Sequence, residues 1–242
     1  MGGIVVFGAG GRAGRAVTAE ARGRGHEVTA VVRDPARYPG LATAGVTVVR
    51  GDVTDAESVA RVAGGRCAAV HTVSPFSGPE QGFDSLDPTF FVKAADALLD
   101  GLAVAGAKRL VAVGLGANLL GADGRPVMDD PAVFPAEIRP FALAHTAGLA
   151  RLRERGDGPV DWVMLTPAGF LEHGGERTGR YRVGGERVPG GEPWLSYADL
   201  AVAVIDEIDR PVRHRERVSV FSFREGAGTT WDQCGERGKN HI

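Results

Sequence analysis

The chain of 242 residues has few lysines and few cysteines. Only three of its 28 basic side chains are lysines, and acidic residues outnumber basic ones slightly, which gives a formal charge of −2. This balance argues against a general nucleic-acid binder, which usually presents a basic face. Cys67 and Cys234 form neither a disulfide framework nor a metal-ligand spacing, as is usual in a reducing cytosol.

Long apolar runs and several catalytic motifs are also absent. No segment approaches the roughly 20 apolar residues of a membrane span, and no apolar run follows a charged start. There is no Gly-x-Ser-x-Gly, His-Glu-x-x-His or P-loop lysine, and the pair His173 and Glu176 is too sparse to predict a metal site. We therefore expect a soluble cytoplasmic protein with a small-molecule substrate, no metal, and neither nucleic-acid nor membrane partners; the oligomeric state stays open.

Short apolar segments alternate along the chain with segments of helical period. The expected strands are residues 4–7, 28–32, 46–49, 67–73, 110–113, 162–165 and 218–221. The expected helices are residues 15–22, 56–62, 90–105, 141–155 and 196–208, the last capped by Ser196. Apolar strands that lack polar alternation and are separated by helices predict an α/β fold, a doubly wound parallel sheet of the Rossmann type.

The domain organisation is expected to be simple. Residues 1–223 are predicted to form a single dinucleotide-binding domain, in which residues 168–195 make a lid-like region on the substrate side. Within that region, residues 180–183 and 187–188 flank a Gly-Gly-Glu segment, which is typical of a small hairpin or loop. The polar, Gly-rich residues 224–242 are expected to form a flexible tail.

A glycine-rich turn directly follows the first predicted strand. It consists of Gly8, Ala9, Gly10, Gly11, Arg12, Ala13 and Gly14. Gly8 permits a tight turn, Gly11 lets the backbone approach a pyrophosphate, and Gly14 lets the helix pack closely on the strand. The following helix offers free N–H groups and the positive end of its dipole to phosphates. Between a strand and a helix this spacing predicts a dinucleotide site; an ordinary Gly-rich turn is the alternative.

The end of the second predicted strand indicates which dinucleotide is bound. NAD sites usually carry Asp or Glu there, whereas this chain has Arg33. A guanidinium forks onto a 2′-phosphate, and Arg12 and Arg37 could join it. The sequence thus predicts NADP(H), while Asp34 keeps NAD(H) as an alternative.

Later strand ends supply further candidate cofactor contacts, because ligands of open α/β sheets bind at the carboxyl ends of the strands. Asp52, next to Val53, can accept a hydrogen bond from the adenine amino group, whereas Asp55 is expected only to cap a helix. The remaining predicted contacts are Thr72, Val73, Ser74 and Gly114.

The substrate side offers a few candidates. His145, on the predicted helix 141–155, could supply a proton near neutral pH, although a buried packing histidine is the commoner outcome. Asn118 could bond a substrate carbonyl or the nicotinamide ribose. Phe76, Phe134 and Phe170 fall in predicted loops over the crevice and are candidates for an apolar substrate pocket.

Together these features resemble the atypical short-chain dehydrogenase/reductases, in the branch with NAD(P)H-binding domains similar to biliverdin reductase B or to the nitrogen repressor. The resemblance covers roughly residues 3–221. It is carried by the stretches 8–14, 22–29, 33–35, 51–53, 113–119, 134–137, 162–167, 177–181 and 196–201. It implies the fold and a nicotinamide cofactor but leaves the substrate open.

The chain departs from the resembling proteins in several places. Thr is usual at the position of Gly10, and a Ser-containing segment is usual at Asn118. The Tyr-x-x-x-Lys dyad of typical short-chain dehydrogenases is absent, because Tyr38, Tyr181 and Tyr197 have no lysine four residues later. Hydride transfer remains feasible, since the cofactor carries that chemistry.

The predicted function is therefore NADP(H)-dependent oxidoreduction of a small conjugated carbonyl, quinone or flavin-like acceptor. A non-redox cyclase or isomerase on the same fold is one alternative. A dinucleotide-sensing regulator without turnover is another, because the fold alone does not decide the function.

Overall fold

The computed structural model describes residues 2–75 and 86–223. The candidate pocket residue Phe76 and the predicted tail 224–242 lie outside the described residues. In the part of the chain that is described, no helix is long and apolar enough to cross a membrane. The same residues contain no group of three side chains suited to hold a metal ion.

The centre of the molecule is an eight-stranded sheet with the strand order β3-β2-β1-β4-β5-β6-β10-β8. Its strands are β1 (Ile4–Phe7), β2 (Val28–Val32), β3 (Val46–Arg50), β4 (Ala68–His71), β5 (Arg109–Val113), β6 (Asp161–Pro167), β8 (Arg182–Gly184) and β10 (Glu216–Phe221). All pairs are parallel except the antiparallel pair of β8 and β10. The strand order reverses beside β1, so the sheet is doubly wound, as predicted, and its crevice lies between β1 and β4.

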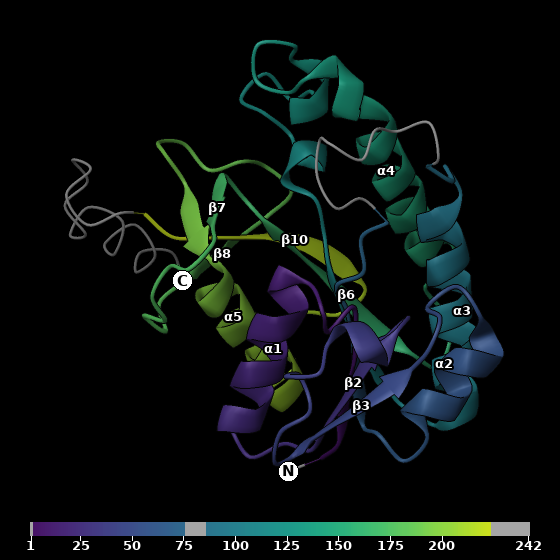
Figure 1. Cartoon of the computed structure of the whole chain (residues 1–242). Helices are drawn as coiled ribbons and strands as arrows, with labels where there is room; N and C mark the ends of the chain where they lie inside the picture. The colour runs from purple at the N-terminus through teal and green to yellow at the C-terminus, as the bar shows by residue number, and fades with distance from the viewer. Residues whose placement is uncertain (1, 76–85, 224–242) are drawn as a thin grey trace, which may run out of the picture.

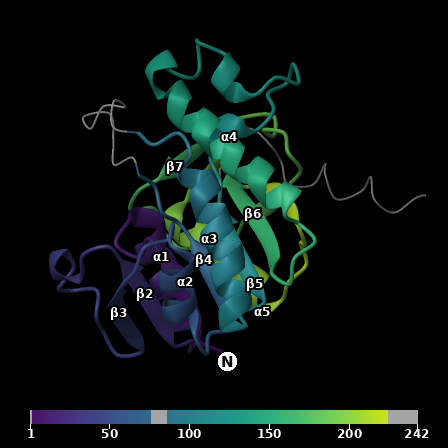
Figure 2. The ribbon, with the colours of Figure 1, turned by 90° about the vertical axis from the view of Figure 1, so that its right-hand side faces the viewer.

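Helices cover both faces of the sheet. The helices α1 (Arg12–Gly23) and α5 (Tyr197–Asp209) lie side by side on one face, and α2 (Ala56–Ala63), α3 (Phe90–Ala105) and α4 (Arg139–Glu154) cover the other (Figures 1 and 2). Alternate residues of β1 enter the two cores: Val6 packs with the α1 and α5 side chains, and Val5 with those of α2, α3 and α4. Burial on both faces explains why the strands are continuously apolar.

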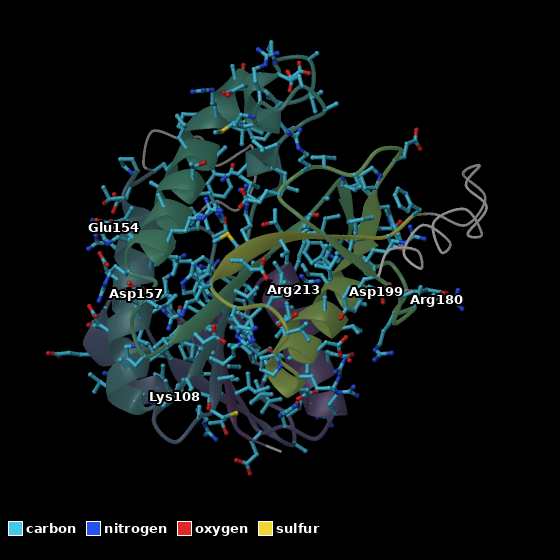
Figure 3. The ribbon with its side chains drawn as sticks, turned by 180° about the vertical axis from the view of Figure 1, so that it is seen from behind. Lys108, Glu154, Asp157, Arg180, Asp199 and Arg213 are labelled. Atoms are coloured by element: carbon cyan, nitrogen blue, oxygen red, sulfur yellow. The ribbon has the colours of Figure 1, made fainter. Side chains whose placement is uncertain are left out.

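The region 168–195 contains two short strands that the sequence did not indicate. They are β7 (Phe170–Glu172) and β9 (Trp194–Ser196), which pair in parallel as a separate small sheet. Phe170 therefore lies in a strand and not in a loop. Asp199, in the first turn of α5, accepts hydrogen bonds from the Thr178 hydroxyl (2.6 Å) and the Gly179 backbone (2.7 Å). Figure 3 shows Asp199 beside the segment that carries Arg180.

The hairpin considered for residues 180–188 does not form. The strand β8 pairs with β10, and the residues that follow it run along the segment after β5. The Leu120 backbone N–H donates to the Glu186 carbonyl at 2.9 Å, and the Val188 N–H donates to the Leu120 carbonyl at 2.9 Å. The open edge of β10 offers a full row of backbone partners, so a distant strand replaces the local turn as the partner of β8.

Short 3-10 turns complete the described structure. They are η1 (Pro35–Arg37), η3 (Gly116–Asn118), η4 (Val127–Asp129) and η5 (Ala136–Ile138). The first follows β2, and the other three lie between β5 and α4. They place the candidate cofactor and substrate residues at the carboxyl edge of the sheet.

Candidate functional site

The turn between β1 and α1 is shaped by two close backbone approaches. Gly8 has a φ of 84°, and a Cβ on it would lie 2.9 Å from the Thr72 carbonyl carbon. A Cβ on Gly14 would lie 2.1 Å from the Gly8 carbonyl oxygen. Gly11 differs, because it is exposed and its Cβ would meet only the Gly8 oxygen, at 3.4 Å. A side chain at Gly11 would therefore project mostly into open space.

Among the residues that the structure describes, no side chain caps the N-terminus of α1. Its N-cap is Gly11, and its first turn contains no acidic residue. The helix α2 shows the contrast, since Asp55 caps it by accepting from the Glu57 backbone at 3.0 Å, as predicted. The free N–H groups and the dipole of α1 thus remain available to an anion.

Four arginines with exposed side chains surround this edge of the sheet. They are Arg12, Arg33, Arg37 and Arg50, and none has a carboxylate within ion-pair distance among the described residues. Other arginines are paired more than once: Arg24 contacts three carboxylates, and Arg155 contacts two. A phosphate is a suitable counter-ion for such free guanidinium groups.

Arg50 was missed by sequence reasoning. It ends β3, and the parallel register places it opposite Val32, the residue before Arg33. A pattern of apolar residues alone locates β3 but does not reveal this register. The structure thus adds a fourth cation to the candidate phosphate site.

Tyr38 forms one wall of the turn. A Cβ on Gly10 would lie 2.4 Å from the Tyr38 ring, and the Arg15 guanidinium carbon lies 5.7 Å from the ring centroid. Arg15 Nε also donates to the Gly10 carbonyl at 2.9 Å. The Tyr38 ring therefore occupies the space that a side chain at residue 10 would need.

The next strand ends carry the remaining candidate cofactor residues. Asp52 is exposed, and its Oδ1 accepts from the Thr54 backbone (2.9 Å) and hydroxyl (2.7 Å). The Val53 side chain belongs to the core beneath α2 and α3. The Thr72 hydroxyl donates to the Phe7 carbonyl at 2.9 Å, which ties the end of β4 to β1.

Three further candidates lie on the β4 and β5 side of the crevice. Val73 is half-buried and Ser74 is exposed, directly after β4. Gly114 follows β5, and a Cβ there would lie 2.3 Å from the Thr166 hydroxyl oxygen, so its small size serves close packing of β5 on β6. The sheet thus brings the candidate residues after β1, β2, β3, β4 and β5 to one edge.

His145 lines a small cavity of about 20 Å³ between the sheet, α3 and α4. Burial lowers the pKa of His145 to about 3, with His71 contributing, and burial lowers the pKa of His71 to about 4. Both rings are therefore neutral at physiological pH, and His145 carries no imidazolium proton to donate. This environment favours a packing role for His145 over proton transfer.

The other substrate-side candidates lie in different surroundings. Asn118, in η3 after β5, is 8% exposed. Phe134 is half-buried and packs with a cluster that contains the neighbouring Ala117. Phe170, in β7, has 62% of its surface exposed. Asn118 and Phe134 thus share one neighbourhood beyond β5.

The NAD(P)H-binding family matches residues 8–211. The chain belongs to this family. The uncharacterized protein YwnB of Bacillus subtilis (strain 168) is 31% identical over an alignment of 229 residues, which covers 92% of this chain and 99% of YwnB. These matches confirm the resemblance to atypical NAD(P)H-binding short-chain dehydrogenase/reductases.

Two solved structures show the same fold. A candidate epimerase from Bacteroides thetaiotaomicron has a TM-score of 0.77 and 31% identity, covering 91% of this chain and 97% of that one. A candidate NADH-flavin reductase from Streptococcus pneumoniae has a TM-score of 0.75 and 28% identity, covering 92% of this chain and 100% of that one. The chain is therefore similar along most of its length to a candidate epimerase and to a candidate NADH-flavin reductase.

Proposed function

We propose that this protein is an NADP(H)-dependent oxidoreductase that reduces a small conjugated carbonyl, quinone or flavin-like acceptor. The open backbone at Gly11 and the uncapped start of α1 are suited to the pyrophosphate. Arg33 would bind the 2′-phosphate, with Arg12, Arg37 and Arg50 around it. The observation that carries the cofactor choice is this group of exposed guanidinium groups without carboxylate partners among the described residues.

The residues near the crevice support this acceptor class. When bound, the reduced nicotinamide supplies a hydride, while the protein orients the reactants. The chain lacks the Tyr-x-x-x-Lys dyad, and burial leaves His145 neutral. An acceptor that takes its proton from water fits this setting, and quinones, flavins and conjugated carbonyls are of this kind. The Streptococcus pneumoniae relative, a candidate NADH-flavin reductase, supports a flavin-like acceptor.

Stopped-flow oxidation of NADPH and NADH against a panel of quinones, flavins and enones tests this proposal. We expect loss of the reduced-nicotinamide absorbance, faster with NADPH than with NADH at limiting cofactor. Gly11→Val is the matched control, because it should remove the phosphate contacts without filling the protein core. Tight NADPH binding without oxidation by any acceptor would contradict the proposal and support a dinucleotide-sensing regulator.

The second candidate is a non-redox isomerisation or epimerisation that uses the same bound cofactor. The similarity to the Bacteroides thetaiotaomicron candidate epimerase favours it. Conversion of a substrate to a product of equal oxidation state, with no net change in cofactor absorbance, would support this candidate over the first.

A further inference from the structure

Arg217, on β10, is an arginine whose side chain is only 7% exposed. Its Nη1 donates to the Asn118 backbone carbonyl at 3.0 Å, and its Nε donates to the Glu186 carboxylate at 3.2 Å. Burial lowers the pKa of Arg217 below its usual value, while Glu186 opposes that shift. A buried guanidinium is costly unless its hydrogen bonds are made, so Arg217 depends on both partners.

The side chain of Asn118 is also buried, and its hydrogen bonding is incomplete. Its Oδ1 atom has no hydrogen-bond partner among the described residues. Buried amide groups in folded proteins are nearly always satisfied, either by the protein or by an ordered water molecule. Asn118 lies in η3, after β5, at the carboxyl edge where ligands of this fold bind. A ligand bound at this edge, directly or through such a water, is therefore a suitable partner for the amide.

Glu186 joins Arg217 to other elements that surround this loop. Its backbone carbonyl accepts from Leu120, two residues after Asn118. Its carboxylate also pairs with Arg153 of α4, whose side chain is 48% exposed. Arg217 and Arg153 thus share one carboxylate, but only Arg217 has a hydrogen bond to the Asn118 backbone.

We propose that Arg217 is a positioning residue: it fixes the Asn118 backbone so that the Asn118 amide meets the acceptor substrate. This inference rests on the proposed function, because it takes the carboxyl edge of the sheet near β5 as the place of the acceptor. Arg217 contacts the Asn118 backbone carbonyl and acts on the acceptor through Asn118. Small displacements of such a contact reduce turnover strongly, while the distant adenosine end of the cofactor is unaffected.

The matched pair Arg217→Met and Arg153→Met tests the role of Arg217. Both variants remove one cation from Glu186, but only the first removes the donor to Asn118. In Arg217→Met we expect hydrogen exchange of residues 116–120 to be about tenfold faster and the acceptor kcat to fall by about 10- to 100-fold. The dissociation constant of NADPH should not change. In Arg153→Met all three quantities should stay near those of the unsubstituted protein.

Two further variants connect the effect to Asn118. Asn118→Ala should lower the acceptor kcat, and adding Arg217→Met to it should lower kcat little more, because both act through one contact. Arg217→Lys keeps a charged donor and should recover part of the protection from hydrogen exchange. This variant also serves as the test if Arg217→Met does not fold.

Equal rates of hydrogen exchange at residues 116–120 in Arg217→Met and Arg153→Met would overturn the positioning role. It would also be overturned if the loss of kcat in the double variant equalled the product of the two single-variant losses. If the unsubstituted protein oxidises no acceptor, the proposed function fails. The hydrogen-exchange comparison still decides whether Arg217 fixes Asn118, because it needs no turnover.

Discussion

The imidazole ring of His145 lies against the ring of Phe91, with the ring centroids 3.8 Å apart and the planes tilted by 35°. Phe141 lies on another side of the imidazole, at 5.3 Å. The close approach of α4 to α3 leaves no room for a side chain at Gly148, where a Cβ would lie 2.5 Å from that of Phe91. His145 is thus part of the packing that joins these two helices.

His145→Gln should therefore lower the melting temperature and leave NADPH affinity and turnover nearly unchanged. The loss of ring packing is expected to cost about 1–3 kcal/mol. Thermal melting and stopped-flow assays of the same preparation check both expectations. His214→Gln, at an exposed histidine paired with Asp161, is the control and should melt normally. A stable His145→Gln variant with a large loss of kcat would instead identify His145 as a proton donor.

The two buried histidines also predict how stability changes with pH. Each has a folded-state pKa below the 6.5 of a free histidine, at about 3 for His145 and about 4 for His71. As the pH falls below 6.5, the unfolded chain binds protons that the folded chain does not, so the free energy of unfolding decreases. The slope is up to about 1.4 kcal/mol per pH unit for each histidine. Urea unfolding between pH 6.5 and 5 should show this slope, and His145→Gln should reduce it. An unchanged slope in that variant would contradict the prediction.

Arg33→Ala should weaken NADPH binding by about ten- to a hundredfold, because a charge-assisted hydrogen bond contributes roughly 1.5–3 kcal/mol. NADH binding should hardly change, since NADH lacks the 2′-phosphate. Arg210→Ala is the matched control: Arg210 is likewise exposed but follows α5 at its far end. Fluorescence titration with both cofactors measures the effect. Equal losses for NADPH and NADH would show that Arg33 does not recognise the phosphate.

Gly11 and Gly14 should respond differently to substitution. Gly11→Val should abolish NADPH binding in a folded protein, because its side chain would project into open space where the phosphate is proposed to bind. Gly14→Ala should destabilise the protein itself, since its Cβ would lie 2.1 Å from the Gly8 oxygen. Circular dichroism melts and cofactor titrations separate the two effects. A Gly11→Val variant that retains NADPH affinity would place the phosphates elsewhere.

Gly10→Thr should be tolerated only when Tyr38 is also reduced in size. A Cβ at residue 10 would overlap the Tyr38 ring, so the single variant must displace that ring. Tyr38→Ala combined with Gly10→Thr should recover much of the lost stability, measured as the free energy of unfolding. Purely additive losses in the double variant would mean that the two positions are not coupled.

The features that depend on local sequence were predictable. The bounds of α3 agree with the predicted helix 90–105, and the fold class follows from the alternation of apolar strands and helices. The start of α1 was placed too late, at Arg15 and not at Arg12, because the glycine turn has no apolar periodicity to mark its helical residues. Strands β7 and β9 were missed because each has three residues and finds its partner across a long segment.

The candidate site likewise contains features that the local sequence predicts and features that depend on tertiary contacts. The Gly8 to Gly14 turn is a local motif, so its geometry could be predicted from spacing. Arg50 reaches the edge only through the β2–β3 register, and Tyr38 covers Gly10 only after the chain has folded back. The environment of His145 depends on side chains from α3 and β4, which no pattern within its own helix reveals.

The position of β10 in the sheet determines which parts of the fold can form only late in synthesis. It is the last strand that the structure describes, yet it lies between β6 and β8, and it supplies Arg217. The glycine turn and its neighbouring strands are synthesised long before β10 leaves the ribosome. The loop that holds Asn118, by contrast, waits for β10, and so does the edge position of β8. A nascent chain that stops before residue 216 would thus contain the glycine turn but lack the arginine that holds the Asn118 backbone.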